Sequence, residues 1–302
     1  MIMYFLTDLE SKLVLNKLLP QARKVGVSED LRGWSWARSP MKPFHDNVQI
    51  PMYLACSKYC PTNRDVFLNK VKDIRGEITF PVSVGITTHQ VVAHAFTEFL
   101  DGKERTFEEF WSENKDKVNY TGFDETGRKY IETCAVQVWD MTQMNCKLQV
   151  SNRSAEQYYA SKRYVLSTAV PFLIEHRLSG KLLGLSGLLA IDCYDYMHSI
   201  IFDLKTMPSL SNIESWHKLY TTGYALVLES IYEIPVDIGG LILIYFKDGK
   251  LTMNRDLFFI NDELRSWWLE ERDAKLELIA ERRDPGVAQK CMDNCIYWNE
   301  CH

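Results

Sequence analysis

The second half of the chain constrains the fold most, because short strand-like segments there surround one long amphipathic segment. The five strand-like segments are 169–178, 184–194, 198–205, 236–247 and 250–260. The amphipathic segment, 211–232, lies between the third and the fourth of them. Asp248-Gly249, a dipeptide typical of tight hairpins, joins the last two. Three strands, a helix and two strands in this order predict an α/β fold with a mixed sheet.

The first half of the chain carries apolar residues at helical spacing and few strand signals. The expected helices are 8–25, 84–101, 106–117, 124–142 and 154–166. Pro20 is expected to break the first of them, because proline lacks the backbone N–H that a helix interior uses. A charged helix is expected at 262–283. We therefore expect a mostly helical lobe (1–165), an α/β core (166–283) and a cysteine-rich tail (284–302).

Length and composition exclude several classes of protein. The 302 residues are 46% hydrophobic, which is enough for a sizeable core and excludes a disordered or collagen-like chain. No apolar run approaches the ~18–20 residues that cross a bilayer, and the first residues lack the basic leader of a signal peptide. The sequence therefore predicts a soluble, cytoplasmic protein without a membrane partner. With 35 basic and 40 acidic residues the net charge is −5, so any contact with nucleic acid is expected in a local groove.

Two carboxylates and a lysine lie on the second and third expected strands. Asp192 follows an apolar run, where a carboxylate is costly to bury unless it is paired or binds a cation. Asp203 and Lys205 share one face of the next strand, because side chains alternate along a strand. If the two strands are neighbours, the carboxylates converge on one pocket suited to Mg²⁺ or Mn²⁺, with the ammonium beside it. Such a group supports phosphodiester hydrolysis, whereas an ordinary edge-strand ion pair is the competing interpretation.

Two histidines lie on the expected helix 84–101. His89 follows Gly85 by four residues and can add an imidazole to the two carboxylates as a third metal ligand. His94 falls on a different face of that helix and is expected to have a structural role.

Three of the eight cysteines lie within the last twelve residues: Cys291, Cys295 and Cys301. In a chain without an export signal, such density indicates a metal or iron–sulfur site rather than disulfides. A site of four thiolates needs one more ligand, for which Cys60 is the best candidate and Cys56 the competitor. Structural zinc with His302 as the fourth ligand is the alternative chemistry.

These motifs together carry a family resemblance. In chain order they are Cys60-Pro61, Gly85-x3-His89, the strand-end Asp192, Asp203-x-Lys205 and the three tail cysteines. The combination resembles the RecB-type iron–sulfur nucleases, and most closely the CRISPR-associated exonuclease family four in its archaeal type I-A branch. Leu31-Arg-Gly-Trp34-Ser-Trp36 and Tyr59-Cys-Pro-Thr-Asn-Arg64-Asp65-Val support that branch, and the resemblance covers residues 1–302.

The resemblance implies a restriction-endonuclease-like PD-(D/E)xK core with a [4Fe–4S] cluster that joins the N- and C-terminal segments. It also implies DNA exonuclease activity in CRISPR adaptation, with DNA, including single-stranded ends, and CRISPR integrase subunits as partners. The metal ligands carried over to this chain are His89, Asp192 and Asp203, and the catalytic group is Asp192, Asp203 and Lys205. The cluster ligands carried over are Cys60, Cys291, Cys295 and Cys301.

Members of that family commonly carry a glutamine four residues before a helical tyrosine that follows the lysine motif. In this chain Tyr224 fits the tyrosine and Tyr220 stands in the glutamine position, so both are candidates for orienting DNA. Arg32, Trp34 and Trp36 are candidates for stacking on a single strand, although docking of the helical lobe is the favoured use of the tryptophans. Two other functions stay open: a subunit that binds DNA ends with little or no cleavage, and a RecB-type repair nuclease unrelated to CRISPR.

Overall fold

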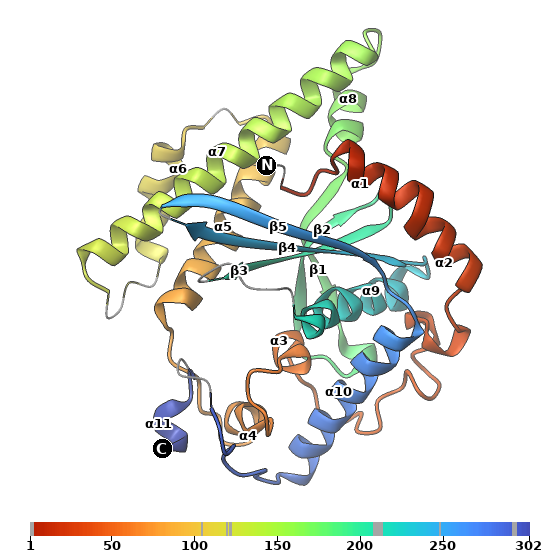
Figure 1. Ribbon diagram of the computed structural model, residues 1–302, viewed down its shortest axis with the longest axis vertical. Coiled ribbons are helices and arrows are strands. Elements are labelled where there is room, and N and C mark those ends of the chain that lie inside the picture. The colour runs from red at the N-terminus through yellow and green to blue at the C-terminus, as the bar shows by residue number, and fades with distance from the viewer. Residues whose placement is uncertain are drawn as a thin grey trace.

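A computed structural model of the chain shows a five-stranded sheet with helices on both faces (Figure 1). The structure describes residues 3–103, 105–118, 120, 123–207, 214–247, 249–291 and 295–302. The strands are β1 (Phe172–Ser179), β2 (Leu188–Asp195), β3 (Ile200–Met207), β4 (Ile238–Lys247) and β5 (Lys250–Phe259). The α/β class and the mixed sheet that the sequence predicts are confirmed.

The strands follow one another in the sheet in chain order, with β3 in the middle. The pairs β1–β2, β2–β3 and β4–β5 are antiparallel, and the pair β3–β4 is parallel. A parallel pair needs a crossover connection, which α9 (Lys218–Tyr232) provides between β3 and β4. All residues of β4 except the last are buried, because helices cover both faces of the sheet at this strand. The central strands therefore hold their side chains between two packed layers.

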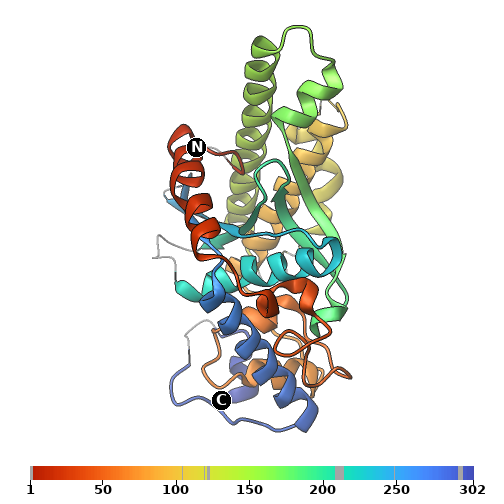
Figure 2. The ribbon, with the colours of Figure 1, turned by 90° about the vertical axis from the view of Figure 1, so that its right-hand side faces the viewer.

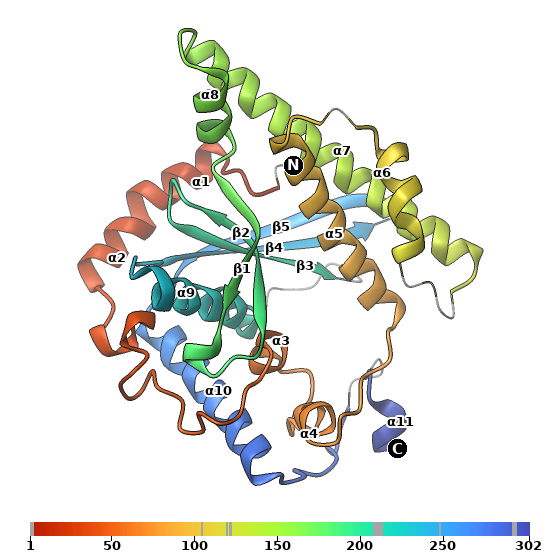
Figure 3. The same ribbon diagram turned by 180° about the vertical axis from the view of Figure 1, so that it is seen from behind.

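Helices from both halves of the chain form these layers. They are α1 (Asp8–Leu13), α2 (Leu19–Val25), α3 (Met52–Cys56), α4 (Arg64–Lys70), α5 (Phe80–Leu100), α6 (Phe107–Asn114), α7 (Glu125–Glu156), α8 (Lys162–Ala169), α10 (Asp262–Glu281) and α11 (Trp298–Cys301). Figure 3 shows α5 crossing one face of the sheet, where Phe96, Trp139 and Phe202 belong to one apolar core. On the other face, α9 and α10 pack over a second core that includes Leu226 and Trp268 (Figure 1).

The helix α7 is longer than the sequence predicts, and the expected pair of helices at 124–142 and 154–166 is wrong. It runs unbroken to Glu156, and α8 begins only at Lys162, after the side chain of Ser161 caps its first turn. The end of α7 projects away from the sheet together with α8 (Figure 2), and Leu148 in its second half is exposed. Because this part packs against little of the core, it lacks the apolar spacing by which amphipathic helices are recognised.

Pro20 does not break the first helical segment, contrary to the expectation. Helical backbone continues from Asp8 to Val25 through a π-helical stretch, Val14–Leu18. The N–H of Leu19 bonds to the carbonyl of Val14, and Pro20 lies in the first turn of α2. Proline is tolerated in a first turn, because its missing N–H removes a bond that such a position often lacks.

Two expected boundaries fall next to residues outside the described part of the chain. The helix expected from residue 211 begins as α9 at Lys218, after a 3-10 turn at Ser215–His217, and residues 208–213 lie outside the description. Asp248 of the expected hairpin turn also lies outside it, while β4 and β5 pair on either side as predicted. Among the described residues, no helix is both long and apolar enough to cross a bilayer.

The segment around Arg32 is held by a buried network of charges. Arg32 donates to Glu229 Oε1 at 2.8 Å and to Asp237 Oδ1 at 2.5 Å, and Arg265 binds Glu229 with two further bonds of 2.8 and 3.0 Å. A Cβ on Gly33 would lie 2.0 Å from the carbonyl oxygen of Leu226, so only glycine fits against α9 here. Arg32 is 8% exposed and engaged in this network, so it docks the N-terminal segment instead of stacking on DNA.

Candidate active site and cysteine site

Neighbouring strands bring Asp192 and Asp203 together. The antiparallel pairing of Cys193 with Phe202 places the two aspartates opposite one another, just beyond the last paired residues. The N–H of Leu204 donates a 2.7 Å hydrogen bond to Asp192 Oδ2 and so fixes that carboxylate against β3. Their exposed fractions are only 9% and 2%, so both carboxylates are held inside the protein.

Lys205 lies beside Asp203 on the same face of β3. Its Nζ is 3.0 Å from Asp203 Oδ1 and 2.9 Å from Oδ2. Phe202 and Leu204 point the other way, into the apolar core beneath α5. The structure thus assembles the carboxylate, the lysine and the packing behind them in the arrangement that strand alternation predicts.

A third carboxylate, Glu175, joins the site together with His89. His89 Nδ1, from the middle of α5, lies 3.2 Å from Asp192 Oδ1. His89, Glu175 and Asp192 each offer one possible metal-binding atom, and these three atoms lie within 4.8 Å of one another. Asp203 is not part of this compact set, because its carboxylate faces Lys205. His94, by contrast, is exposed on α5 and packs on Phe110, as its predicted structural role requires.

Sequence reasoning missed Glu175. It lies on β1 between Ile174 and His176, which pair with Cys193 and Ile191, so it stands across from Asp192. Its φ is 48°, a left-handed conformation that is strained for a residue with a side chain and that is often found at functional sites. An acidic residue inside an expected apolar strand is the same signal that pointed to Asp192, and it could have pointed to Glu175 as well.

The charges at this site are unevenly balanced. Burial, with the charge of Asp192 added to it, raises the pKa of Asp203 to about 6 despite the opposing ammonium of Lys205. Burial and the same charge also raise the pKa of Glu175. Burial alone would raise the pKa of Asp192, but His89 and Lys205 outweigh it and the pKa of Asp192 is lowered. Three carboxylates therefore share one lysine and one imidazole, which favours an additional cation.

The donor set fits a hard divalent ion. Carboxylate oxygens with one imidazole nitrogen are ligands that Mg²⁺ and Mn²⁺ accept in proteins. Asp203 Oδ2 is buried 2.9 Å from the Lys205 ammonium, so this carboxylate already has one cation beside it. Buried carboxylates are costly unless they are paired or bind a cation, and here three carboxylates share Lys205 and His89. His89, Glu175 and Asp192 are the residues that would hold such an ion, with Asp203 next to them.

The two candidate tyrosines lie on α9. The Lys205 Nζ stands 3.6 Å from the centroid of the Tyr220 ring, which is 8% exposed. Burial and nearby acidic groups that include Asp192 and Asp203 raise the pKa of Tyr224, so its hydroxyl stays protonated. Both tyrosines therefore lie near the carboxylates, and Tyr220 contacts the lysine directly.

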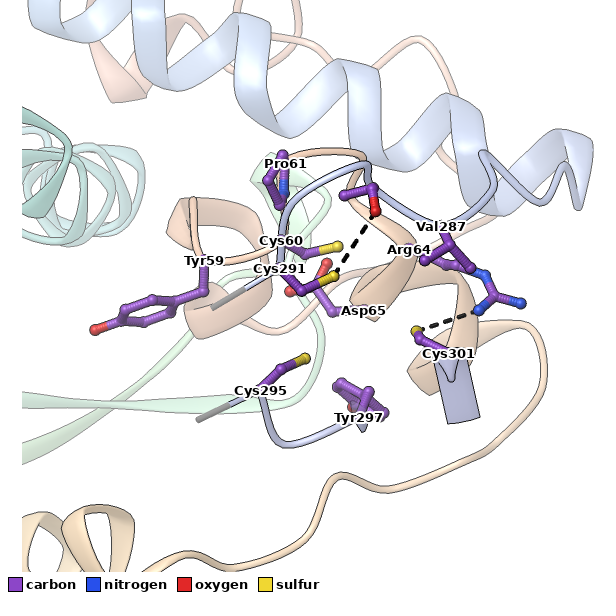
Figure 4. A pocket seen from close by; sticks show the side chains of 11 residues that line it. Tyr59, Cys60, Pro61, Arg64, Asp65, Val287, Cys291, Cys295, Tyr297 and Cys301 are labelled. Carbon is purple, nitrogen blue, oxygen red and sulfur yellow. Dashed lines mark hydrogen bonds between the residues drawn. The ribbon is translucent and has the colours of Figure 1, made fainter. Parts of the chain in front are cut away.

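A second site gathers four of the eight cysteines (Figure 4). Cys60, Cys291, Cys295 and Cys301 line one small cavity, together with Tyr59, Pro61, Arg64, Asp65, Val287, Ala288 and Tyr297. Cys60 comes from the start of the chain and the other three from its end, and their sulfur atoms point toward a common space (Figure 4). Four thiols around one cavity fit a four-thiolate site for an iron–sulfur cluster or a metal ion.

Cys56 and His302 lie outside this cavity. The Cys56 side chain is completely buried, its Sγ contacts the sulfur of Met52 at 3.6 Å, and burial raises its thiol pKa to about 12. The ring of His302 packs on Trp298 instead of lining the cavity. Of the alternatives that the sequence left open, the geometry therefore favours Cys60 over Cys56 and four cysteines over three cysteines with a histidine.

Arg64 ties the two halves of the cysteine site together. Its guanidinium lies 3.2 Å from Cys301 Sγ and 3.2 Å from the carbonyl oxygen of Glu300, and it pairs with Asp284 at 3.0 Å. One side chain from α4 thus contacts three positions of the C-terminal segment (Figure 4 shows the bond to Cys301).

Comparison with known proteins agrees with this arrangement. The family described as CRISPR-associated exonuclease Csa1 matches residues 3–302. The chain belongs to the Csa1 family. A Csa1 protein of Saccharolobus solfataricus is 30% identical, with 96% of this chain and 97% of the relative aligned. A Csa1 protein of Thermoproteus tenax is 27% identical over 98% of this chain and 99% of the relative. The predicted membership in an archaeal CRISPR-associated exonuclease family is confirmed.

A solved structure is also similar to this Csa1-family chain, but distantly. A crystal structure from Eubacterium rectale that is assigned as an exonuclease aligns with 79% of this chain and 87% of its own, at 10% identity and a TM-score of 0.40. At that distance it adds nothing to the assignment of individual residues. The site residues of this Csa1-family chain therefore rest on its own geometry.

Proposed function

We propose that the chain is a metal-dependent DNA exonuclease of CRISPR adaptation that processes the ends of new spacers. The observation that carries this proposal is the group of His89, Glu175 and Asp192 beside the Asp203–Lys205 pair. Membership in the Csa1 family supports the exonuclease activity and the connection with CRISPR.

Each residue has a role that its surroundings support. A divalent ion held by His89, Glu175 and Asp192 would supply a Lewis acid for the phosphate and lower the pKa of a water molecule. Lys205 places a positive charge where negative charge develops on the phosphate during displacement. Asp203 fixes the lysine side chain through contacts of 2.9 and 3.0 Å, so the ammonium is already in position before the substrate arrives.

The test is cleavage of end-labelled DNA by the purified protein with Mg²⁺, with Mn²⁺ and with EDTA. Wild-type protein should shorten linear DNA from its ends only when a divalent ion is present, and it should spare closed circles. Lys205→Ala and Asp203→Ala should each reduce the rate by about 100-fold or more, as the loss of a preorganised charge in an active site does. Lys250→Ala is the matched control, because Lys250 is exposed at the far end of β5.

The same preparation separates the alternatives. A protein that binds DNA ends tightly but shortens them no faster than Lys205→Ala is an end-binding subunit, and the nuclease proposal is then wrong. Binding of DNA should weaken as salt rises, because phosphate contacts release counterions even in a protein whose net charge is −5. A role in adaptation predicts that a host carrying Lys205→Ala acquires spacers of altered length, whereas unchanged spacers favour a repair nuclease.

We propose further that Cys60, Cys291, Cys295 and Cys301 hold a [4Fe–4S] cluster. The shared cavity supports this proposal. The effect of the cluster is structural, because a link between Cys60 and the chain end restricts the unfolded chain over a long loop. Protein purified without oxygen should be brown and contain about four irons and as many sulfides per chain. A colourless protein with one zinc ion would refute the cluster and assign the cavity to zinc.

A further inference from the structure

The ammonium of Lys205 is enclosed from two sides. Asp203 lies on one side at 2.9 Å, and the face of the Tyr220 ring lies on the other, with its centroid 3.6 Å from Nζ. An aromatic ring attracts a cation placed over its face, because its π electrons make that face negative. The lysine therefore has few positions open to it, although its side chain retains some exposure to the solvent from which a phosphate would approach.

The Tyr220 ring is itself firmly held. Its hydroxyl donates a 3.3 Å hydrogen bond to the backbone carbonyl of Tyr53 in α3, and the ring is 8% exposed. With this hydroxyl engaged and the ring face covered by the ammonium, Tyr220 has no free group to offer DNA. Its position four residues before Tyr224, where the family commonly carries a glutamine, is thus used for a contact within the protein.

Two more aromatic rings extend this contact to the cysteine site. Trp216 lies 6.3 Å from Tyr220, and Tyr59 stands edge-on to Trp216 with a centroid distance of 5.0 Å. Tyr59 precedes Cys60 and lines the same cavity as the four cysteines. Rings from two segments that are distant in the sequence therefore form one row from the cysteine cavity to Lys205.

We propose that Tyr220 is the positioning residue for Lys205, and that Trp216 and Tyr59 support it from the cysteine site; this rests on the proposed nuclease function. The ring holds the ammonium at the place where the phosphate is to be stabilised and spares the reaction the cost of ordering a flexible side chain. The row of rings also provides a packed connection between the cysteine site and Lys205.

The test compares Tyr220→Phe with Tyr220→Leu. The Phe variant keeps the ring face and should retain kcat within about twofold, whereas the Leu variant should lose about 10- to 30-fold in kcat with KM for DNA unchanged. Trp216→Leu should lose kcat in the same direction, and Trp216→Phe should restore it. Tyr232→Leu is the control on the same helix, because Tyr232 is 46% exposed near the other end of α9.

A second measurement does not depend on activity. Reductive methylation with ¹³C labels the lysines for NMR, and Lys205→Arg identifies the Lys205 signal. That signal should be shifted upfield by the ring in the wild type and in Tyr220→Phe, and it should lose this shift in Tyr220→Leu. An inactive wild type that shows the shift would refute the nuclease while the contact stands. Equal kcat in the Phe and Leu variants, a loss confined to KM, or the absence of a shift would each overturn the positioning role.

Discussion

Replacing Glu229 by glutamine should destabilise the protein more than most single substitutions of similar size. Glu229 is completely buried on α9 and accepts five hydrogen bonds, from Arg32, Gly33, Val236 and twice from Arg265. Arg265 and Arg32 outweigh burial and keep the pKa of Glu229 below its ordinary value, so the side chain is charged at neutral pH. The substitution preserves the shape of the side chain and removes its charge.

The size of the effect follows from these contacts. Glutamine offers one acceptor oxygen in place of two, and its NH2 group takes the place of the other oxygen. This NH2 group then faces N–H donors with which it cannot form a hydrogen bond. Arg265 then keeps its charge in the interior without a full counter-charge, a situation that costs about 3–5 kcal/mol. For a chain of 302 residues, about 4 kcal/mol corresponds to a fall in Tm of roughly 6 °C.

Thermal unfolding followed by circular dichroism, supported by denaturant titration, measures this loss. Glu270→Gln is the matched control, because Glu270 is exposed on α10 and should change stability by no more than about 0.5 kcal/mol. The DNA affinity of properly folded Glu229→Gln should equal that of the wild type, since the network only docks the N-terminal segment. A Tm within 2 °C of the wild type, roughly 1 kcal/mol or less by the same scaling, would refute the reasoning.

Three further outcomes follow from the two sites and from one buried histidine. His89→Ala and Glu175→Gln should each require more Mg²⁺ or Mn²⁺ for half-maximal cleavage, by about 10-fold or more, because each removes one of three clustered ligands; unchanged metal titrations would remove them from the site. Cys60→Ser should lower iron content, colour and melting temperature, while Cys56→Ser should leave iron and colour unchanged; the reverse result would exchange their roles. Burial lowers the pKa of His217 to about 4, below the ~6.5 of an unfolded chain, so the unfolded state binds the proton first and stability falls as pH drops from about 6.5 toward 4. His217→Leu should flatten that part of a stability curve measured against pH, and an unaltered slope would show that His217 does not titrate in this way.

Local patterns were enough to predict the parts of the candidate active site that share one strand or one strand pair. Alternation places Asp203 and Lys205 on one face, and an antiparallel neighbour brings in Asp192, so neither step needs knowledge of the tertiary fold. His89 joins the site only because α5 crosses the sheet beside Asp192. The sequence pattern made His89 a possible third ligand, and the family resemblance supported this prediction.

What the sequence did not reveal depends on packing between distant segments. Glu175 reaches the site because it lies across from Asp192 and has a left-handed backbone conformation. That backbone conformation cannot be predicted from the pattern of side chains. The sequence favoured Cys60 as the fourth ligand but left Cys56 as a competitor, and the burial of Cys56 in α3, against α10, separates them. The second half of α7 gave no signal, because a helix that projects from the core needs no apolar face.

The bond between Arg64 and Cys301 has a consequence for the order in which the protein is made. These two residues are 237 positions apart. At a synthesis rate of about 5–20 residues per second, roughly 10–50 s pass between their translation. During that interval every strand of the sheet is synthesised, while Cys60 waits without its three partner thiols. The strands that carry the carboxylate site are therefore available to fold before the cysteine site, and any iron or zinc bound by the four thiols would be inserted only after the whole sheet has been synthesised.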